Sequence, residues 1–203
     1  MKNTIRPIML AVVLAMGVTV TLASGCLSAA PSKAVQVGEE VPGFTLKDVN
    51  GKEYTLKQFE GNIVVLDFCS QECPWSRGAD PAVAKLVKDY KDKDVVVLGI
   101  DSHHATKPSQ IKAYLEEKKL SFPVLKDVGN QYADKVGAKK TPEVYVVDAK
   151  GKLAYHGAVD NRSRPEGKPS KHHVRNALDA LIAGEEVPVK TVKLWGCGIK
   201  RAG

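Results

Sequence analysis

A cysteine followed directly by a proline, at the junction of a predicted strand and a predicted helix, constrains this chain most. Residues 63–68 are apolar and largely β-branched apart from Asp67, which predicts a buried strand. Cys73 lies five residues beyond this strand, Pro74 follows, and helix-compatible sequence runs over about 79–90. Proline is favoured in the first turn of a helix, so Cys73 is expected at a helix N-terminus. The free N–H groups and the dipole there stabilise a thiolate, which predicts a reactive cysteine.

The first 25 residues have the pattern of a secretory signal peptide. Lys2 and Arg6 form a basic start, residues 8–23 are apolar, and residues 23–25 are small. A membrane anchor helix is the alternative, but the apolar run is short for one and ends in small residues. We therefore expect export and removal of residues 1–25.

Cys26 follows this segment directly. Residues 22–26, Leu-Ala-Ser-Gly-Cys, resemble a bacterial lipoprotein box, although Ala23 stands where the box prefers leucine. The resemblance implies that Cys26 is lipidated and anchors the protein to a membrane on the periplasmic side, with residues 26–36 as lipidated cysteine and tether. Plain cleavage nearby is the alternative.

The remaining residues are enough for one domain with a sizeable core. The chain has 30 Lys and Arg against 23 Asp and Glu, and the lysines are scattered among acids, as at residues 85–94, a mixture typical of a solvated helix face. A basic patch with interleaved aromatic residues is absent from the sequence, so nucleic acid is not an expected partner.

Strands are predicted to alternate with helices along the chain. Predicted strands cover 44–48, 54–56, 63–68, 94–101, 122–125, 143–148 and 152–156, and predicted helices cover 79–90, 108–118, 130–136 and 172–183. This order implies an α/β domain with a mixed central sheet and helices on both faces. We place the domain at residues 37–184 and a C-terminal tail at 185–203.

Three features in order resemble the thioredoxin-fold redoxins, the branch that holds TlpA-like reductases and peroxiredoxins. Residues 37–59 resemble the opening segment of that family, with Asn-Gly at a predicted hairpin turn. The strand followed by Cys73 has the family's spacing for its nucleophile. Pro142, before the strand at 143–147, matches the cis-proline that faces that cysteine. The end of the tail, Gly-Cys-Gly-Ile-Lys at 196–200, resembles the end of a redoxin subgroup.

The resemblance implies a thioredoxin-like fold with an N-terminal hairpin extension and a C-terminal cysteine-containing tail. It implies a thiol–disulfide oxidoreductase or thiol-dependent antioxidant in which Cys73 is the nucleophile. The expected substrates are a protein thiol or disulfide or a small peroxide, with a thiol electron donor and no cofactor. Thr141 and Pro142 are expected to dock substrate, Trp75 to offer an aromatic contact, and Arg77 to lower the thiol pKa or bind substrate.

The chain also departs from the family patterns. A dithiol reductase has a second cysteine three residues after the first, where this chain has Ser76, so that position cannot resolve a mixed disulfide. The peroxiredoxin pattern has threonine and proline where this chain has Ser70 and Leu66. Peroxidase activity is therefore compatible with the sequence but not indicated by it.

Two other thiols could resolve an intermediate at Cys73. Beyond Cys26, the chain has Cys69, Cys73 and Cys197, an odd number that argues against purely structural disulfides. An extended link would place Cys69 about 13 Å from Cys73, beyond the roughly 7 Å that a disulfide tolerates. Cys197 is therefore preferred as the resolving thiol, and Cys69 stays open if its loop folds back.

Two further classes of function are weighed against this one. A copper chaperone would use Cys69 and Cys73 with a distant histidine, and the candidate histidines are His103, His104, His172 and His173. The cysteine spacing is displaced from that of such chaperones, and the preferred interpretation includes no metal. A non-catalytic partner-binding module, with Cys73 inactive, is motivated by the missing second cysteine.

Overall fold

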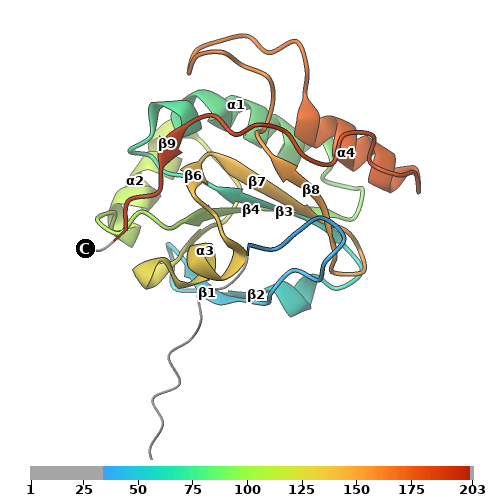
Figure 1. Ribbon diagram of the computed structural model, residues 1–203. Coiled ribbons are helices and arrows are strands. Elements are labelled where there is room, and N and C mark those ends of the chain that lie inside the picture. Colours follow the sequence, from blue (N-terminus) through green and yellow to red (C-terminus); the bar gives the residue numbers. More distant parts are fainter. Residues whose placement is uncertain (1–33, 202–203) are drawn as a thin grey trace, which may run out of the picture. The chain divides into compact units, whose positions relative to one another are not determined.

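A seven-stranded mixed sheet lies at the centre of the structure, a computed structural model that describes residues 34–201 (Figure 1). Its strand order is β2-β1-β5-β4-β3-β7-β8, and a separate two-stranded sheet joins β6 and β9. The strands are β1 Thr45–Asp48, β2 Glu53–Thr55, β3 Ile63–Phe68, β4 Val95–Asp101, β5 Val124–Lys126, β6 Lys140–Thr141, β7 Glu143–Val147, β8 Leu153–Gly157 and β9 Cys197–Gly198. The helices are α1 Pro74–Asp89, α2 Pro108–Lys118, α3 Gln131–Val136 and α4 His173–Ile182, with short 3-10 turns at Leu56–Phe59 and Val128–Asn130.

Strand β3 lies in the middle of the sheet, and all six of its residues are buried. It pairs in parallel with β4 and antiparallel with β7. Strands β4 and β5 are also parallel, whereas the two hairpins, β1–β2 and β7–β8, are antiparallel. The mixed sheet and both hairpins predicted from the sequence are therefore confirmed.

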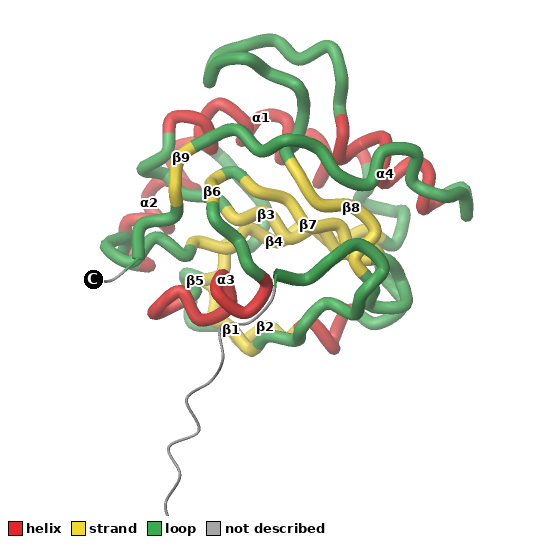
Figure 2. Tube along the Cα trace, viewed as in Figure 1, coloured by secondary structure: helices red, strands yellow, loops and turns green. Residues whose placement is uncertain are grey.

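The alternation of side chains along β3 divides the core into two layers. Val65 faces the layer made by α1, α2 and α4, whereas Val64, Leu66 and Phe68 face α3 and the N-terminal segment. Figures 1 and 2 show α3 on one side of the sheet and α1 on the other. The predicted arrangement of helices on both faces is confirmed, and the C-terminal end of β3 emerges between these layers.

The N-terminal hairpin is part of the central sheet, because β1 pairs antiparallel with β5. Helix α1 begins at Pro74 with Cys73 as its N-cap, so the predicted helix N-terminus at Cys73 is confirmed. The helix-compatible run over residues 79–90 does not include the first turn, because Gly78 and Pro81 lower the helix propensity there.

No helix among residues 34–201 is both long and apolar enough to cross a bilayer. The predicted signal peptide at 1–25 and Cys26 lie outside the described residues.

Asp67, on the central strand, is a carboxyl group in the core. It is 1% exposed, and its Oδ1 has no hydrogen-bond partner among the described residues. Burial raises its pKa from 3.8 to about 8, and the nearby Asp80 adds to the shift. Asp67 is therefore held as a neutral acid below about pH 8.

We expect Asp67→Asn to be more stable than the parent at alkaline pH. The folded pKa lies above the unfolded one, so folding takes up a proton between pH 3.8 and about 8, and the free energy of unfolding falls as the pH rises through this range. The amide of the variant cannot ionise. Its free energy of unfolding should therefore exceed that of the parent by on the order of a few kcal/mol at pH 9 and differ little from it near pH 4. Denaturant titration across this range measures the difference. Asp92→Asn, at an exposed position, is the control, and a gain that does not vary with pH would contradict the expectation.

Candidate active site

Cys73 ends the loop after β3 and is the N-cap residue of α1. The loop is closed by hydrogen bonds of its own: the Ser70 N–H donates to Ser76 Oγ at 3.2 Å, and the Cys73 N–H donates to the Ser70 carbonyl at 3.0 Å. Ser76, which replaces the second cysteine of a dithiol motif, therefore has a structural role at this turn. Cys73 itself is only 2% exposed.

The sulfur of Cys197 lies against that of Cys73. The two Sγ atoms are 2.6 Å apart, and both residues are free cysteines in this structure. A disulfide needs an S–S distance of about 2.05 Å, so a small movement would join them. The structure thus brings together two residues that are 124 positions apart in the chain.

A backbone pairing holds Cys197 in this place. Strand β9 pairs antiparallel with β6, and Cys197 lies opposite Thr141. The Thr141 carbonyl oxygen is also 3.0 Å from Cys73 Sγ. The Thr141–Pro142 peptide bond is cis, as the position of this proline predicted. Thr141 therefore lies beside both cysteines: its backbone pairs with that of Cys197, and its carbonyl oxygen contacts the Cys73 sulfur.

The surroundings of the two sulfurs shift their pKa values in opposite directions. Burial alone would raise the pKa of Cys73, but hydrogen bonds from the Cys197 thiol and the Thr141 side chain outweigh it. The N–H groups of Ser76 and Cys197 also donate to this sulfur, and its pKa is lowered from 9.0. Burial and the neighbouring Cys73 raise the pKa of Cys197 to about 11. Cys73 is therefore the thiol that ionises, and Cys197 retains its proton.

An aromatic and cationic cluster anchors the tail just before Cys197. The Trp195 ring lies 5.1 Å from the Trp75 ring, and its Nε1 donates to the Asp160 carbonyl at 2.8 Å. The Arg162 guanidinium lies 5.4 Å from the Trp195 ring and is ion-paired with Asp160 at 2.6 Å. Trp75, two residues after Cys73, therefore packs against the chain's own tail.

Glu143, the first residue of β7, organises the segment before Thr141. Its buried Oε2 accepts the N–H groups of Lys139 and Lys140 at 2.8 and 2.7 Å. Its Oε1 pairs with His156 Nε2 at 2.8 Å. Burial opposes ionisation, but these bonds lower the pKa of Glu143, so the carboxylate stays charged. Neither Glu143 nor Trp195 was singled out from the sequence. The role of Glu143 depends on how the turn before β7 folds onto its carboxylate, and Trp195 acts through partners far along the chain.

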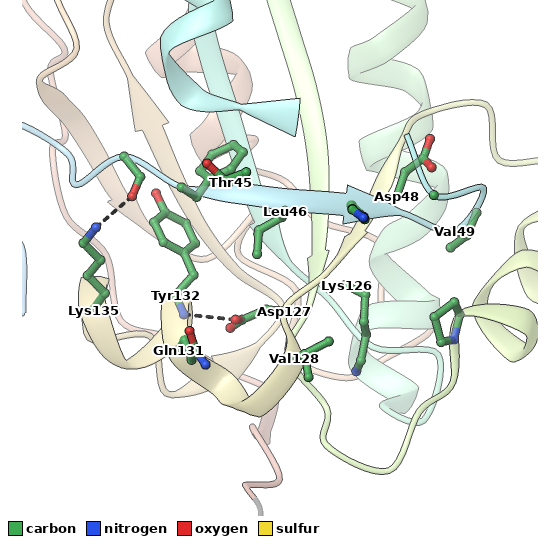
Figure 3. A pocket seen from close by; sticks show the side chains of 15 residues that line it. Thr45, Leu46, Asp48, Val49, Lys126, Asp127, Val128, Gln131, Tyr132 and Lys135 are labelled. Atoms are coloured by element: carbon green, nitrogen blue, oxygen red, sulfur yellow. Dashed lines mark hydrogen bonds between the residues drawn. The ribbon is translucent and has the colours of Figure 1, made fainter. Parts of the chain in front are cut away.

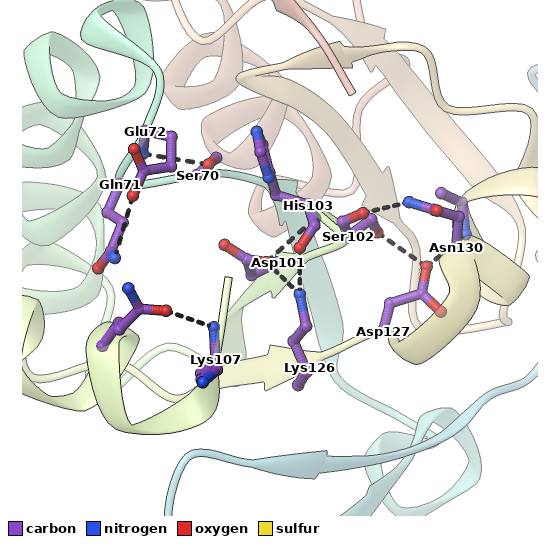
Figure 4. Close-up of polar contacts among 12 residues, drawn as sticks. Ser70, Gln71, Glu72, Asp101, Ser102, His103, Lys107, Lys126, Asp127 and Asn130 are labelled. Carbon is purple, nitrogen blue, oxygen red and sulfur yellow. Dashed lines mark hydrogen bonds and ion pairs between the residues drawn. The ribbon is translucent and has the colours of Figure 1, made fainter. Parts of the chain in front are cut away.

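Polar contacts fix the loop after β4, to which the end of the tail attaches (Figure 4). Lys126 Nζ donates to Asp101 Oδ1 at 2.7 Å and to the His103 carbonyl at 2.6 Å, and all three residues are buried. The next residue, His104, donates its N–H to the Lys200 carbonyl at 3.0 Å. This loop therefore supports the tail beyond Cys197.

Two residues predicted at the site lie in other surroundings. Arg77 is exposed, and its Nη1 donates to the Gln71 carbonyl at 2.8 Å, so it closes the Cys73 loop. Cys69 is buried in the core layer of α1, α2 and α4, where burial and the nearby Asp67 raise its pKa well above 9.0. Cys69 therefore resists ionisation.

The described residues also bear on metal binding and on other cavities. Between residues 34 and 201, no three His, Cys, Asp or Glu side chains cluster in a way that could hold a metal ion. Cys69, Cys73 and a histidine, the three ligands of the copper alternative, therefore do not form such a cluster in this part of the chain. A pocket of about 650 Å³ lies between β1 and α3, lined by Phe44, Asp127 and Tyr132 among others (Figure 3). None of the thiol-site residues lines this pocket.

Comparison with known proteins decides the family. The model of the AhpC/TSA family matches residues 37–156, more than half of the chain. The chain belongs to the AhpC/TSA family. This AhpC/TSA protein is 27% identical over 146 residues to the thiol-disulfide oxidoreductase ResA of Bacillus cereus, a match that covers 72% of this chain and 82% of ResA. It is 32% identical over 140 residues to the chloroplastic peroxiredoxin Q of Triticum aestivum, covering 65% of this chain and 62% of that protein.

A solved structure with a similar fold is that of a hypothetical protein of Sinorhizobium meliloti. Its TM-score is 0.78 and its sequence identity 29%, covering 85% of this chain and 98% of that one. The predicted thioredoxin-like fold and the redoxin family are confirmed, and with them the prediction of an oxidoreductase that acts on thiols or peroxides.

We expect Cys197→Ala to raise the pKa of Cys73. The variant removes the thiol that donates to the Cys73 sulfur, whereas the burial that opposes ionisation remains. The inflection in the rate of iodoacetamide alkylation at Cys73, followed against pH, should move to higher pH. Cys69→Ala, in the core layer, should leave the inflection in place. An unchanged inflection in Cys197→Ala would show that the tail thiol does not stabilise the thiolate.

Proposed function

We propose that this protein is a two-cysteine redoxin in which Cys73 is the nucleophile and Cys197 the resolving thiol. The observation that carries the proposal is the 2.6 Å separation of the two sulfurs, together with the lowered pKa of one and the raised pKa of the other. A low pKa favours the attacking thiolate, and a protonated neighbour can supply the second sulfur afterwards.

With a peroxide, the Cys73 thiolate attacks one oxygen and the O–O bond breaks. Cys73 becomes a sulfenic acid, and the other oxygen leaves as hydroxide or alkoxide, which takes up a proton. The Cys197 sulfur then attacks the sulfenic sulfur, the S–S bond forms, and the oxygen leaves as water. An external dithiol returns two electrons and restores both thiols.

With a disulfide substrate, the same thiolate attacks one sulfur and releases the other as a thiolate. The Cys197 sulfur then attacks the Cys73 sulfur of this mixed disulfide. The Cys73–Cys197 bond forms, and the rest of the substrate leaves as a thiol. ResA is named as a thiol-disulfide oxidoreductase and peroxiredoxin Q as a peroxiredoxin. Similarity to both supports a redoxin that reacts with disulfides or with peroxides.

The structure supports Cys197 over Cys69 as the resolving thiol. Cys69 packs in the core with Val65 and Phe122, and its raised pKa disfavours ionisation. Cys197 is partly exposed and is the thiol in contact with Cys73. Thr141, Pro142 and Trp75 surround this pair, and we propose that they position the reacting groups, while Arg77 shapes the loop.

We expect one equivalent of hydrogen peroxide to form a Cys73–Cys197 disulfide that dithiothreitol reverses, mapped by mass spectrometry on the full chain. Cys197→Ser should instead accumulate a sulfenic acid at Cys73 that dimedone traps, because the resolving sulfur is gone. Cys73→Ser should abolish the bond.

Cys69→Ala is the matched control and should retain the Cys73–Cys197 bond. A Cys69–Cys73 bond, or an unmodified Cys73 after treatment with peroxide and with oxidised glutathione, would contradict the proposal.

We propose further that the protein is exported by residues 1–25 and anchored through lipid on Cys26, so that the redoxin domain lies on the periplasmic side. The apolar run and the Leu-Ala-Ser-Gly-Cys sequence support this placement. In a bacterial host, labelled palmitate should enter the parent chain and not Cys26→Ser. Equal labelling of both would contradict lipidation at this residue.

A further inference from the structure

The backbone edge beside the reactive thiol is occupied by the chain's own tail. In β9, Cys197 pairs with Thr141 and Gly198 pairs with Lys140. The N–H of Ile199 extends this pairing by donating to the Lys139 carbonyl at 3.0 Å. Figure 1 shows this short strand beside β6, with the tail running past α1 on its way there.

An open strand edge is a place where an extended polypeptide can bind through main-chain hydrogen bonds. Residues 139–141 would offer such an edge next to the Cys73 sulfur if β9 were absent. A polypeptide that carries a disulfide would have to bring one of its sulfurs to Cys73, which is only 2% exposed. The residues that flank this disulfide would also have to displace β9 from the strand edge. A small oxidant needs only to reach the sulfur.

Contacts on both sides of β9 hold it in place. On one side, Trp195 is bound by the Asp160 carbonyl and lies against Trp75 and Arg162. On the other side, Ile199 is buried at 7% exposure in the core layer of α3. These contacts come from widely separated parts of the domain, so releasing β9 disrupts several of them together.

Gly196 allows the tail to approach this closely. Its φ is +119°, a conformation that favours glycine, and a Cβ atom there would overlap the Thr141 carbonyl oxygen. The absence of a side chain thus lets β9 lie against β6 directly after Trp195.

We propose that strand β9, held by Trp195 and Gly196, restricts Cys73 to small electrophiles, namely peroxides and low-molecular-weight disulfides, and excludes extended polypeptide disulfides. The inference rests on the proposed redox function of Cys73 and deepens it by naming the substrate class. The electron balance is that given above: two electrons pass from Cys73 and Cys197 to the small oxidant, and an external dithiol returns them. Trp195 is a positioning residue, because it acts through the tail and not on the reacting atoms.

The test compares first-step rate constants for reduced full-length protein with three probes: hydrogen peroxide, oxidised glutathione and insulin. Modification of Cys73 is quantified by mass spectrometry after acid quenching. In the parent, oxidised glutathione should react at least tenfold faster than the insulin disulfides. Trp195→Ala and Gly196→Ala should each raise the ratio of the insulin rate to the glutathione rate tenfold or more, because β9 no longer covers the edge. Lys193→Ala, at an exposed tail position, is the control and should leave all three rates unchanged.

Hydrogen exchange at the Ile199 amide reports whether β9 is released, and exchange along β3 reports whether the domain stays folded. The double variant Trp195→Ala/Gly196→Ala lacks both restraints, and it is measured in case one restraint is enough to hold β9 in place. A parent that reacts with insulin as fast as with oxidised glutathione would overturn the inference, and so would an unchanged ratio in all three variants, whether or not the Ile199 amide is exposed. Failure of every probe to modify Cys73 in the parent would instead refute the proposed function, and this inference with it.

Discussion

The short pairing of β9 with β6 is the interaction on which the thiol site depends. It places the backbone of Cys197 opposite Thr141, and this brings the two sulfurs to 2.6 Å. Without it, Cys73 would lose the thiol and the N–H group of Cys197 that lower its pKa. One backbone contact therefore fixes the geometry of the cysteine pair and also the proton distribution between the two sulfurs.

This pairing is supported by buried charge on one side and by aromatic packing on the other. The Glu143 carboxylate accepts the N–H groups of Lys139 and Lys140, and these bonds hold the backbone of β6 in place. Trp195 anchors the tail through the Asp160 carbonyl and the ring of Trp75. Hydrogen bonds to a charged acceptor are stronger than neutral ones, so Glu143 is well suited to hold a short strand that has few bonds of its own.

The second thiol comes from the tail and not from helix α1. This origin bears on which electrophiles can reach Cys73. In a Cys-x-x-Cys arrangement the second sulfur lies three residues after the first, so no strand from the tail is needed to supply it. Here Ser76 closes the loop, and Cys197 arrives on a strand that covers this edge. In the proposed function, the strand that supplies the resolving sulfur also restricts access to Cys73.

The sequence by itself determined the fold class and the position of Cys73 at the start of a helix. The continuous apolar run of β3, the Cys73–Pro74 junction and the Thr141–Pro142 dipeptide are local signals, because they depend on backbone propensity and on burial within a few residues. The Cys73–Pro74 junction also marked the start of α1, although Gly78 and Pro81 weaken the helical pattern of the turns that follow.

Only the tertiary structure decided which thiol meets Cys73 and what Cys69 does. The contact with Cys197 joins residues 124 positions apart through a two-residue strand, a pairing too short to leave a periodic pattern in the sequence. Cys69 could have turned toward the loop or toward the core, and the packing of α1, α2 and α4 against β3 places it in the core. Long-range contacts of this kind depend on the shape of the whole core, which local sequence does not encode.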